Sequence, residues 1–419
     1  MPDILSTTLS DTADETSVSY KGWRVAAASG TGVFFAALPF YSFAVLLKPV
    51  SEEYGWPREA VSSAFGSMTL GAALFAPLMG TLFDRFGPRR ICGTCLLMSA
   101  SAFASLSMLT PSLWHLYGVF TVVGLATPGT SAVVYSRAVA SWFDRKRGTA
   151  LAVMMASTAV GAIVYPPVAA ALIRLLGWRN ACLTLGVVSL VAGVPIVARF
   201  VRERAATAAH ERQSASGVTV RDALRSRAFW ILITVVFGST LALNGVIVHL
   251  SALLTDRGVS SSRAAMVVSA LGGASLTGRL LTGWLLDRFA ARPVSFVMLA
   301  IAAMGTLLLA VAESFGAGLL AAALIGFGTG GEFDVVPYLL SRYFGLRSLS
   351  TLYGLHWTAW GLSGVAGPLL MGRAFDATGS YEAVLVGFAA GTLGVAMLII
   401  ALPASTPHST RAEPSAHPD

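Results

Sequence analysis

Three ionisable side chains, Arg279, Glu332 and Asp334, lie within long apolar stretches of this 419-residue chain. A guanidinium without compensation in a hydrocarbon core costs at least about 2.5–3.5 kcal/mol. A bound carboxylate would offset that cost through two parallel hydrogen bonds. Arg279 is eight residues from the polar break at Asp287, which places it about 12 Å inside a helix. We therefore expect Arg279 to anchor an anionic substrate, and the alternative is a permanent ion pair with a helix carboxylate.

The two acids, Glu332 and Asp334, are suited to carrying a proton. A buried carboxyl group can hold a proton at neutral pH, and a nearby Arg279 would favour its ionised form until an anion arrives. An anion that neutralises Arg279 would then free the carboxylate to take up a proton. Positions i and i+2 of a helix point to different faces, so we expect one acid to face the cavity, and we favour Asp334. The alternative is a static pair with Arg279 or Arg137.

Histidine, amide and tyrosine side chains in other apolar stretches are further candidates. His249 can relay protons or bind a carboxylate because it titrates near neutrality, and Asn244 precedes it by five residues. Asp256 lies where the same stretch ends, and either takes up protons or pairs with the neighbouring Arg257. Helix packing is the alternative role for the others. The candidate substrate ligands besides Arg279 are His249, Asn244, Tyr135 and His356.

The composition indicates the class of protein in which these residues lie. The chain is 55% hydrophobic and 12% charged, with a mean hydropathy of +0.70, whereas a soluble protein carries roughly twice that share of charge. These values exclude a soluble enzyme and a disordered protein. We expect an all-α membrane protein with 12 transmembrane helices. The expected spans are 24–47, 58–82, 91–110, 113–136, 148–174, 180–200, 229–255, 263–286, 294–312, 316–341, 350–374 and 382–402.

The longest polar break divides these spans into six plus six. We expect N- and C-terminal six-helix halves at 21–200 and 229–402, joined by a cytoplasmic linker at 201–228. Disordered cytoplasmic ends are expected at 1–20 and 403–419, and the N-terminal end does not resemble a cleaved signal peptide. With both termini inside, the inner segments hold 21 Lys and Arg and the outer ones 7, which predicts cytoplasmic termini. The net charge of +8 follows from this bias and does not indicate nucleic acid.

A charged motif occurs twice, which indicates an internal repeat. Residues 80–90 read GTLFDRFGPRR and residues 283–293 read GWLLDRFAARP, at an offset of 203, which Gly55 and Gly258 share. We expect a cytoplasmic charge latch that breaks when the halves rock, and the alternative is a cluster that only sets orientation. The second copy has Ala290 in place of Gly87 and is expected to be weaker. The latch residues are Gly80, Asp84, Arg85, Gly87, Arg89, Gly283, Asp287 and Arg288.

The motif and the duplicated six-span halves resemble the major facilitator superfamily over about residues 20–402. Arg58, the Trp142–Gly148 segment, Trp178 and the Arg342–Gly345 segment, with Arg279 eight residues before the loop Asp, resemble its bacterial monocarboxylate and oxalate/formate branch. That resemblance implies the two-halved major facilitator fold and proton-linked transport of small organic anions.

Two departures from that branch bear on the substrate. Lys21 precedes Gly22 where animal monocarboxylate carriers have an acid, and Trp360 replaces the second cation of the oxalate carrier. The missing cation favours monocarboxylates. We therefore expect a proton symporter of monocarboxylates in a bacterial inner membrane, with an organic-anion exchanger or a drug or metabolite exporter as the alternative.

No cofactor, metal or catalytic group is expected. The cysteines Cys92 and Cys95 form a CxxC pair without a second pair to complete a metal site, and no Walker loop or catalytic triad is recognisable. The expected partners are a small carboxylate, protons and the lipid bilayer, and we expect a monomer.

Overall fold

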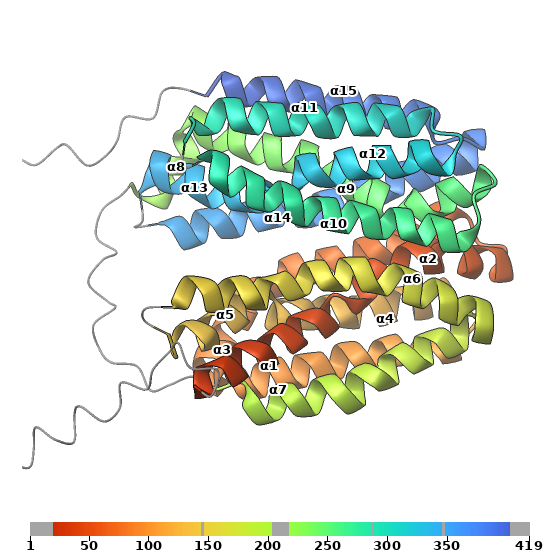
Figure 1. Cartoon of the computed structure of the whole chain (residues 1–419), viewed down its shortest axis with the longest axis horizontal. Helices are drawn as coiled ribbons and strands as arrows, with labels where there is room; N and C mark the ends of the chain where they lie inside the picture. Colours follow the sequence, from red (N-terminus) through yellow and green to blue (C-terminus); the bar gives the residue numbers. More distant parts are fainter. Residues whose placement is uncertain (1–19, 144–145, 203–217, 287, 346–347, 403–419) are drawn as a thin grey trace, which may run out of the picture. The chain divides into compact units, whose positions relative to one another are not determined.

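The computed structural model describes residues 20–143, 146–202, 218–286, 288–345 and 348–402, and its elements within these ranges are helices (Figure 1). Eight helical runs in this part of the chain are long and apolar enough to cross a membrane. One of them, Thr149–Phe200, has 52 residues and is long enough for two spans. The all-helical membrane fold expected from the sequence is confirmed.

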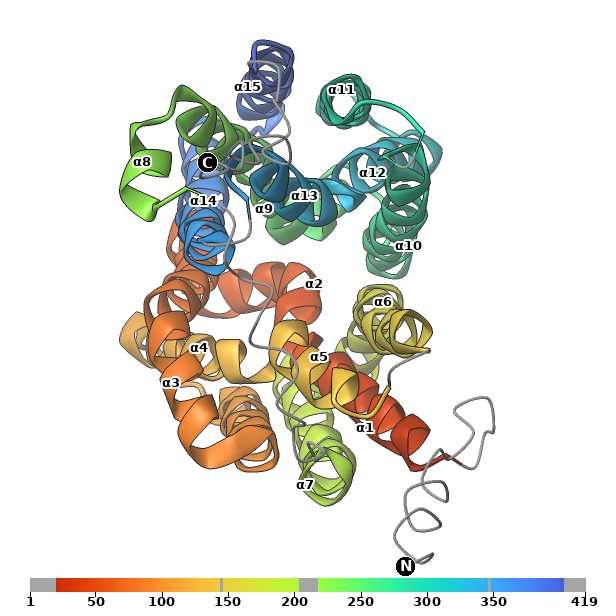
Figure 2. The ribbon, with the colours of Figure 1, turned by 90° about the vertical axis from the view of Figure 1, so that its left-hand side faces the viewer.

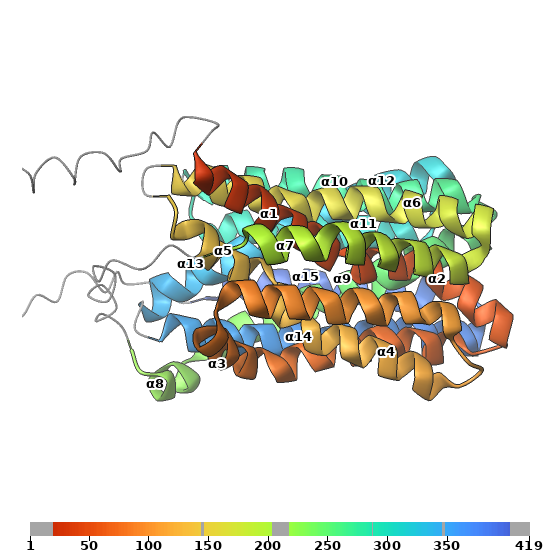
Figure 3. The ribbon, with the colours of Figure 1, turned by 90° about the horizontal axis from the view of Figure 1, so that it is seen from below.

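The chain forms two compact units, and unit 1 contains residues 1–206 and 247–272. Its long helices run side by side (Figure 3), and α3 packs against α4 while α1 packs against α6. A 3₁₀ turn at Thr127–Thr130 separates α4 from α5, and a π turn at Ser189–Gly193 precedes α7. The helices of unit 1 are α1 (Lys21–Ala36), α2 (Leu38–Tyr54), α3 (Arg58–Ser105), α4 (Leu113–Ala126), α5 (Ala132–Ala140), α6 (Arg147–Val188) and α7 (Val194–Phe200).

Unit 2 contains residues 207–246 and 273–419, so α9 and α10 each contribute to both units. In this unit α11 packs against α12 and α15, which Figure 2 shows along the helix axes. The hydroxyl of Ser314 caps α12 by accepting from the Ala317 amide at 3.2 Å. The helices are α8 (Val220–Arg225), α9 (Arg227–Asp256), α10 (Ser261–Leu286), α11 (Ala291–Ala310), α12 (Phe315–Gly330), α13 (Glu332–Phe344), α14 (Leu349–Thr378) and α15 (Glu382–Ile400).

Three of the spans expected to be continuous are broken. The first breaks at Ala37, because Pro39 in the first turn of α2 has no amide hydrogen to continue the ladder. The fourth breaks at the turn that contains Pro128, and the tenth breaks at Gly331, between α12 and α13. The last two breaks fall at equivalent places in the internal repeat, since the offset of 203 places Gly331 opposite Pro128. Broken helices free backbone polar groups inside a membrane protein.

Glycines with positive φ make the sharp turns between successive spans. Gly87 turns α3 with φ 76° and ψ 164°, and Gly177 turns α6 with φ 77° and ψ 159°. This backbone region is essentially restricted to glycine. Ala290, at the second copy of the motif, adopts φ −63° and ψ 139° and begins α11 in extended conformation. The two copies of the motif therefore turn the chain differently, because only the first has a glycine at this position.

Gly87→Ala is expected to destabilise unit 1 by about 1–3 kcal/mol, because the added Cβ makes this backbone conformation strained. Gly283→Ala is the matched control, since Gly283 is helical and its added Cβ would meet no described atom within 4 Å. The thiols of unit 1 lie at Cys92, Cys95 and Cys182, all buried. Their reaction with a fluorogenic thiol dye during heating reports unfolding. An equal unfolding temperature for Gly87→Ala and Gly283→Ala would contradict the expectation.

Candidate functional site

The segment around Arg279 lies against the last turn of α12 because α10 and α12 cross at very short range within unit 2. A Cβ added to Gly278 would lie 2.0 Å from the backbone oxygen of Phe327, and one added to Gly330 would lie 2.0 Å from that of Ser275. Such contacts allow no side chain. Small residues at a helix crossing let the two backbones approach closely in a membrane protein.

The same crossing brings α10 beside the first residue of α13. A Cβ added to Gly331 would lie 2.2 Å from Thr282 Oγ1, and Gly331 directly precedes Glu332. Thr282 follows Arg279 by three residues, so their β-carbons are about 5–6 Å apart. Arg279 is half-buried, within a helix long and apolar enough to span a membrane. The structure thus places the segments that bear the predicted anchor and the predicted acids side by side.

Glu332 is the first residue of α13, and its two carboxyl oxygens have different surroundings. Oε1 is hydrogen bonded to the hydroxyl of Ser239 on α9. Oε2 is buried and has no hydrogen-bond partner among the described residues. A buried polar atom without a partner costs free energy unless water satisfies it. The arrangement therefore has one satisfied and one unsatisfied carboxyl oxygen.

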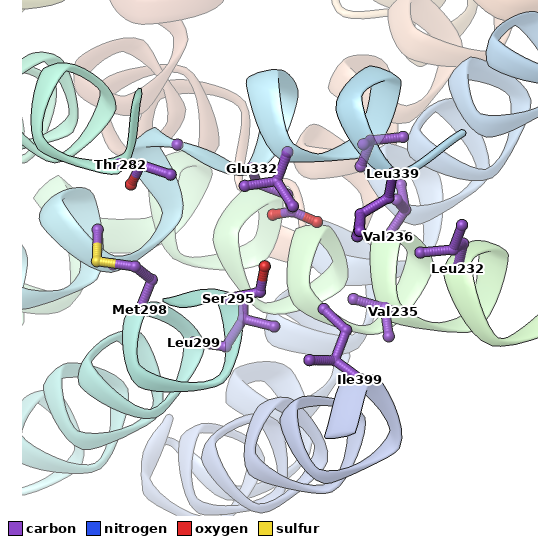
Figure 4. Close-up of a pocket in the computed structure, with 14 residues that line it drawn as sticks. Leu232, Val235, Val236, Thr282, Ser295, Met298, Leu299, Glu332, Leu339 and Ile399 are labelled. Carbon is purple, nitrogen blue, oxygen red and sulfur yellow. The ribbon is translucent and has the colours of Figure 1, made fainter. Parts of the chain in front are cut away.

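Glu332 lines a small pocket inside unit 2 with a volume of about 30 Å³ (Figure 4). Fourteen described residues line it, and Glu332 is the only titratable one among them. Thr282 also lines it, and its buried Oγ1 has no partner in the described part of the chain. The remaining lining is mostly aliphatic and includes Leu232, Val235, Val236, Met298, Leu299 and Ile399.

Asp334 lies on α13, as expected, but its side chain is outside the described residues, and so is that of Arg137 on α5. The preference for Asp334 over Glu332 therefore stays a prediction. Of the two acids, only Glu332 has surroundings that the structure describes.

The other predicted substrate ligands are buried at separate places. Asn244 donates from Nδ2 to Ser363 Oγ at 3.1 Å, and His249, one and a half turns along α9, is completely buried. His356 Nδ1 lies 2.8 Å from the backbone oxygen of Leu352, and its Nε2 has no partner in the described region. The role of these side chains as substrate ligands stays a prediction.

Tyr135 is fully buried in unit 1, where its ring and hydroxyl fill the space beside Gly32. A Cβ added to Gly32 would lie 2.2 Å from the hydroxyl oxygen of Tyr135. This hydroxyl has no hydrogen-bond partner in the part of the chain that is described. Its position therefore reflects tight helix packing, and substrate contact stays a prediction for this residue too.

Asp256 belongs to an ion cluster in unit 1. Arg58 forms a two-pronged contact with the carboxylate, in which Nη1 binds Oδ2 and Nη2 donates to Oδ1 at 2.9 Å. Lys48 Nζ donates to Oδ1 at 2.8 Å and lies 3.8 Å from Glu52. Sequence spacing did not predict these contacts, because Arg58 and Asp256 are 198 residues apart. Proton uptake by Asp256 stays a prediction.

A second cluster that the sequence did not predict lies between α2 and α6. Arg179 pairs with Glu53 and lies over the ring of Trp178, with 4.4 Å between its guanidinium carbon and the ring centre. The indole of Trp178 also donates to Glu53, and Arg179 donates to the hydroxyl of Tyr54 at 2.6 Å. The only feature of the sequence that pointed to this cluster is Gly-Trp-Arg at 177–179. These residues join neighbouring helix ends within unit 1.

The predicted latch is described only in part. The surroundings of Gly80, the side chain of Asp84 and all of Asp287 lie outside the described part of the chain. Arg89 Nε donates to the backbone oxygen of Ala198 on α7, and Arg288 lies 4.0 Å from the ring centre of Trp284. Arg85 lies over the ring of Phe86. The latch stays a prediction. The described contacts of Arg85 and Arg288 are with residues at most four positions away, whereas Arg89 joins α3 to α7.

A sequence model described as Major Facilitator Superfamily matches residues 30–368. The chain belongs to the major facilitator superfamily. As a member it is a multi-pass membrane transporter of small molecules and not an enzyme.

Several curated relatives of this major facilitator protein are transporters. It is 28% identical to the 3-(3-hydroxy-phenyl)propionate transporter of Escherichia coli over 84% of this chain and 87% of that protein. It is also 28% identical to monocarboxylate transporter 11 of Mus musculus, over 92% of this chain and 88% of that one. Both names refer to carboxylate substrates of those proteins.

A solved structure shares the fold. A bacterial homolog of the human lysosomal transporter Spinster, in an inward-facing and occupied conformation, matches with a TM-score of 0.74 and 15% identity. The match covers 93% of this chain and 97% of that one. The major facilitator fold expected from the repeated motif is confirmed by this likeness.

Proposed function

We propose that this protein is a secondary transporter of small organic anions, and that it carries monocarboxylates together with protons by alternating access. The observation that carries the proposal is the side-by-side position, within unit 2, of the Glu332 segment and the Arg279 segment, the latter on a helix long and apolar enough to span a membrane. One segment offers a cation for a carboxylate, and the other offers carboxyl groups for a proton.

Arg279 is the proposed anchor. Its planar guanidinium can bind both oxygens of a carboxylate at once, and a half-buried position leaves part of the side chain accessible to a ligand. The relatives named for hydroxyphenylpropionate and monocarboxylates support a carboxylate substrate. Trp360 at the place of a second cation supports one carboxylate group rather than two.

Proton coupling follows from competition for positive charge. Without a substrate, Arg279 stabilises a carboxylate on the neighbouring α13 segment. A bound anion neutralises Arg279, and the acid then takes up a proton before the loaded protein changes conformation. The charge of the bound anion is then compensated by Arg279, and the acid is neutral because it carries the proton. No isolated charge has to cross the hydrocarbon, which would be costly.

The topology that fits this function has both termini and the 201–228 linker in the cytoplasm of a bacterial cell, in the inner membrane. The threefold excess of Lys and Arg in the corresponding segments supports that orientation. The six-helix halves at 21–200 and 229–402 and a monomeric assembly are part of the same proposal.

The test uses purified protein in liposomes that contain a pH-sensitive dye. Addition of monocarboxylates is expected to acidify the interior faster than in protein-free liposomes, and dicarboxylates are expected to have no effect. If the dye reports no pH change, and labelled anion enters only when the liposomes contain unlabelled anion, the result would support the alternative of an organic-anion exchanger. No response of either kind would contradict an anion substrate and favour an exporter of other metabolites.

A further inference from the structure

The pocket beside Glu332 has the chemistry of a proton site. Its only titratable lining residue among those described is a carboxyl group, and no lining residue is cationic. Asp334 lies two residues after Glu332. Three arginines each lie one helical turn from a lining residue: Arg279 before Thr282, Arg292 before Ser295 and Arg342 after Leu339. An ionised carboxylate is costly among aliphatic side chains, and the neutral acid is much less so.

The hydrogen bonds of Ser239 favour the neutral acid. Its hydroxyl oxygen lies 2.6 Å from the backbone oxygen of Val235 and is also hydrogen bonded to Glu332 Oε1. A hydroxyl group has one proton to donate. If that proton goes to Val235, the second hydrogen bond needs a proton from the carboxyl group. A protonated Glu332 therefore satisfies both hydrogen bonds at once, whereas an ionised one competes with Val235 for the same proton.

The pocket is large enough for one water molecule, and a small rotation of the Glu332 and Thr282 side chains would bring two unpartnered oxygens to its otherwise apolar surface. A volume of about 30 Å³ exceeds the roughly 10–15 Å³ that one water needs, and a buried water also needs two to four polar partners. Glu332 Oε2 and Thr282 Oγ1 are both buried without a partner in the described structure. The hydroxyl of Ser295 also lines the pocket, and Figure 4 shows it on the side of the Glu332 carboxyl group.

We propose that this pocket is a hydrated protonation site, in which Glu332 binds the coupled proton and a water held by Thr282 and Ser295 exchanges it. On release, the O–H bond of the carboxyl group breaks and a new O–H bond forms on the water, which leaves a carboxylate and a hydronium ion. On uptake the same bonds form and break in reverse. The inference rests on the proposed function, because it names the proton site of that symport.

Thr282 connects this site to the proposed anchor. It lies one helical turn after Arg279 on α10 and beside Gly331 of the break. A carboxylate bound at Arg279 would therefore change the electrostatic potential at Glu332 through a short, low-dielectric path. No direct contact between substrate and Glu332 is needed for coupling.

The test is infrared difference spectroscopy of the full-length protein in lipid, with the carboxylic acid C=O band followed against pH. Glu332→Gln is expected to remove a titrating band that persists in Glu313→Gln, whose acid is exposed in the loop before α12. Thr282→Val is expected to move the midpoint of that band to higher pH by about one unit, because the ionised form loses its water. Thr282→Ser should restore the midpoint.

Three results would overturn the assignment. They are a band that persists in Glu332→Gln, a band removed by Asp334→Asn instead, and a midpoint that Thr282→Val leaves unchanged. In liposomes, Glu332→Gln is expected to lose uptake driven by a pH gradient and to keep exchange of labelled anion. Wild-type liposomes without any anion transport would contradict the proposed function, whereas the infrared titration tests the pocket on its own.

Discussion

Arg279→Lys is expected to lower monocarboxylate uptake by about 10- to 100-fold at limiting substrate. A guanidinium binds both oxygens of a carboxylate in one plane, whereas an ammonium group acts as a point charge with rotatable donors. The loss of one charge-assisted hydrogen bond costs about 1.5–3 kcal/mol, which corresponds to that range of affinity. The expected effect is large because the proposed anchor is a single side chain, and position 360 is Trp rather than a second cation.

The measurement is the initial rate of dye acidification in liposomes that contain equal amounts of folded wild type and variant. Arg263→Lys is the matched control, because Arg263 is exposed in the first turn of the same helix. Arg279→Ala should be silent. Uptake by Arg279→Lys at the rate of Arg263→Lys would show that the substrate is not held by a guanidinium at this position.

Gly330→Ala is expected to destabilise unit 2 by at least about 3 kcal/mol, at the upper end of the cost of overpacking. The added Cβ would lie 2.0 Å from the backbone oxygen of Ser275 and 2.9 Å from its Cα. A backbone cannot rotate away as a flexible side chain can, so α10 and α12 must separate. That separation would also displace Arg279 from Glu332, and transport should fall with stability.

Loss of helical circular dichroism on heating measures this effect in detergent. Gly316→Ala is the control on the same helix, since its added Cβ would meet no described atom within 4 Å. Alanine in place of a helical glycine is expected to be neutral or to stabilise by up to about 1 kcal/mol there. Equal melting temperatures for the two variants would mean that the close crossing of α10 and α12 does not exist.

The sequence predicted the helical spans well because long apolar stretches leave few alternatives in a membrane. The sequence also marked Ala290 in place of Gly87, where the two motif copies turn differently, but the weaker second latch expected from that difference stays a prediction. The helix breaks were not predicted. Pro128 and the pair Gly330–Gly331 are tolerated inside membrane helices, so their presence alone does not tell a bend from an interruption.

The sequence was enough to predict which residues form the candidate site, but not how their side chains contact one another. Arg279 and the acids stood out because charge is rare in such stretches. The partner of Glu332 could not be found in this way, because Ser239 lies 93 residues away and the contact depends on how α9 is rotated. Spacing likewise gave no hint that Arg58 would hold Asp256.

The paired helix breaks bear on the history of the chain. The break after Thr130 in unit 1 and the break at Gly331 in unit 2 occupy equivalent positions of the repeat. Duplication of a segment whose helix was already interrupted would place a break at this position in both copies. The residue that follows the break is Ser131 in one copy and Glu332 in the other. The two copies therefore share an interruption in the backbone and differ in the chemistry of the side chain beside it.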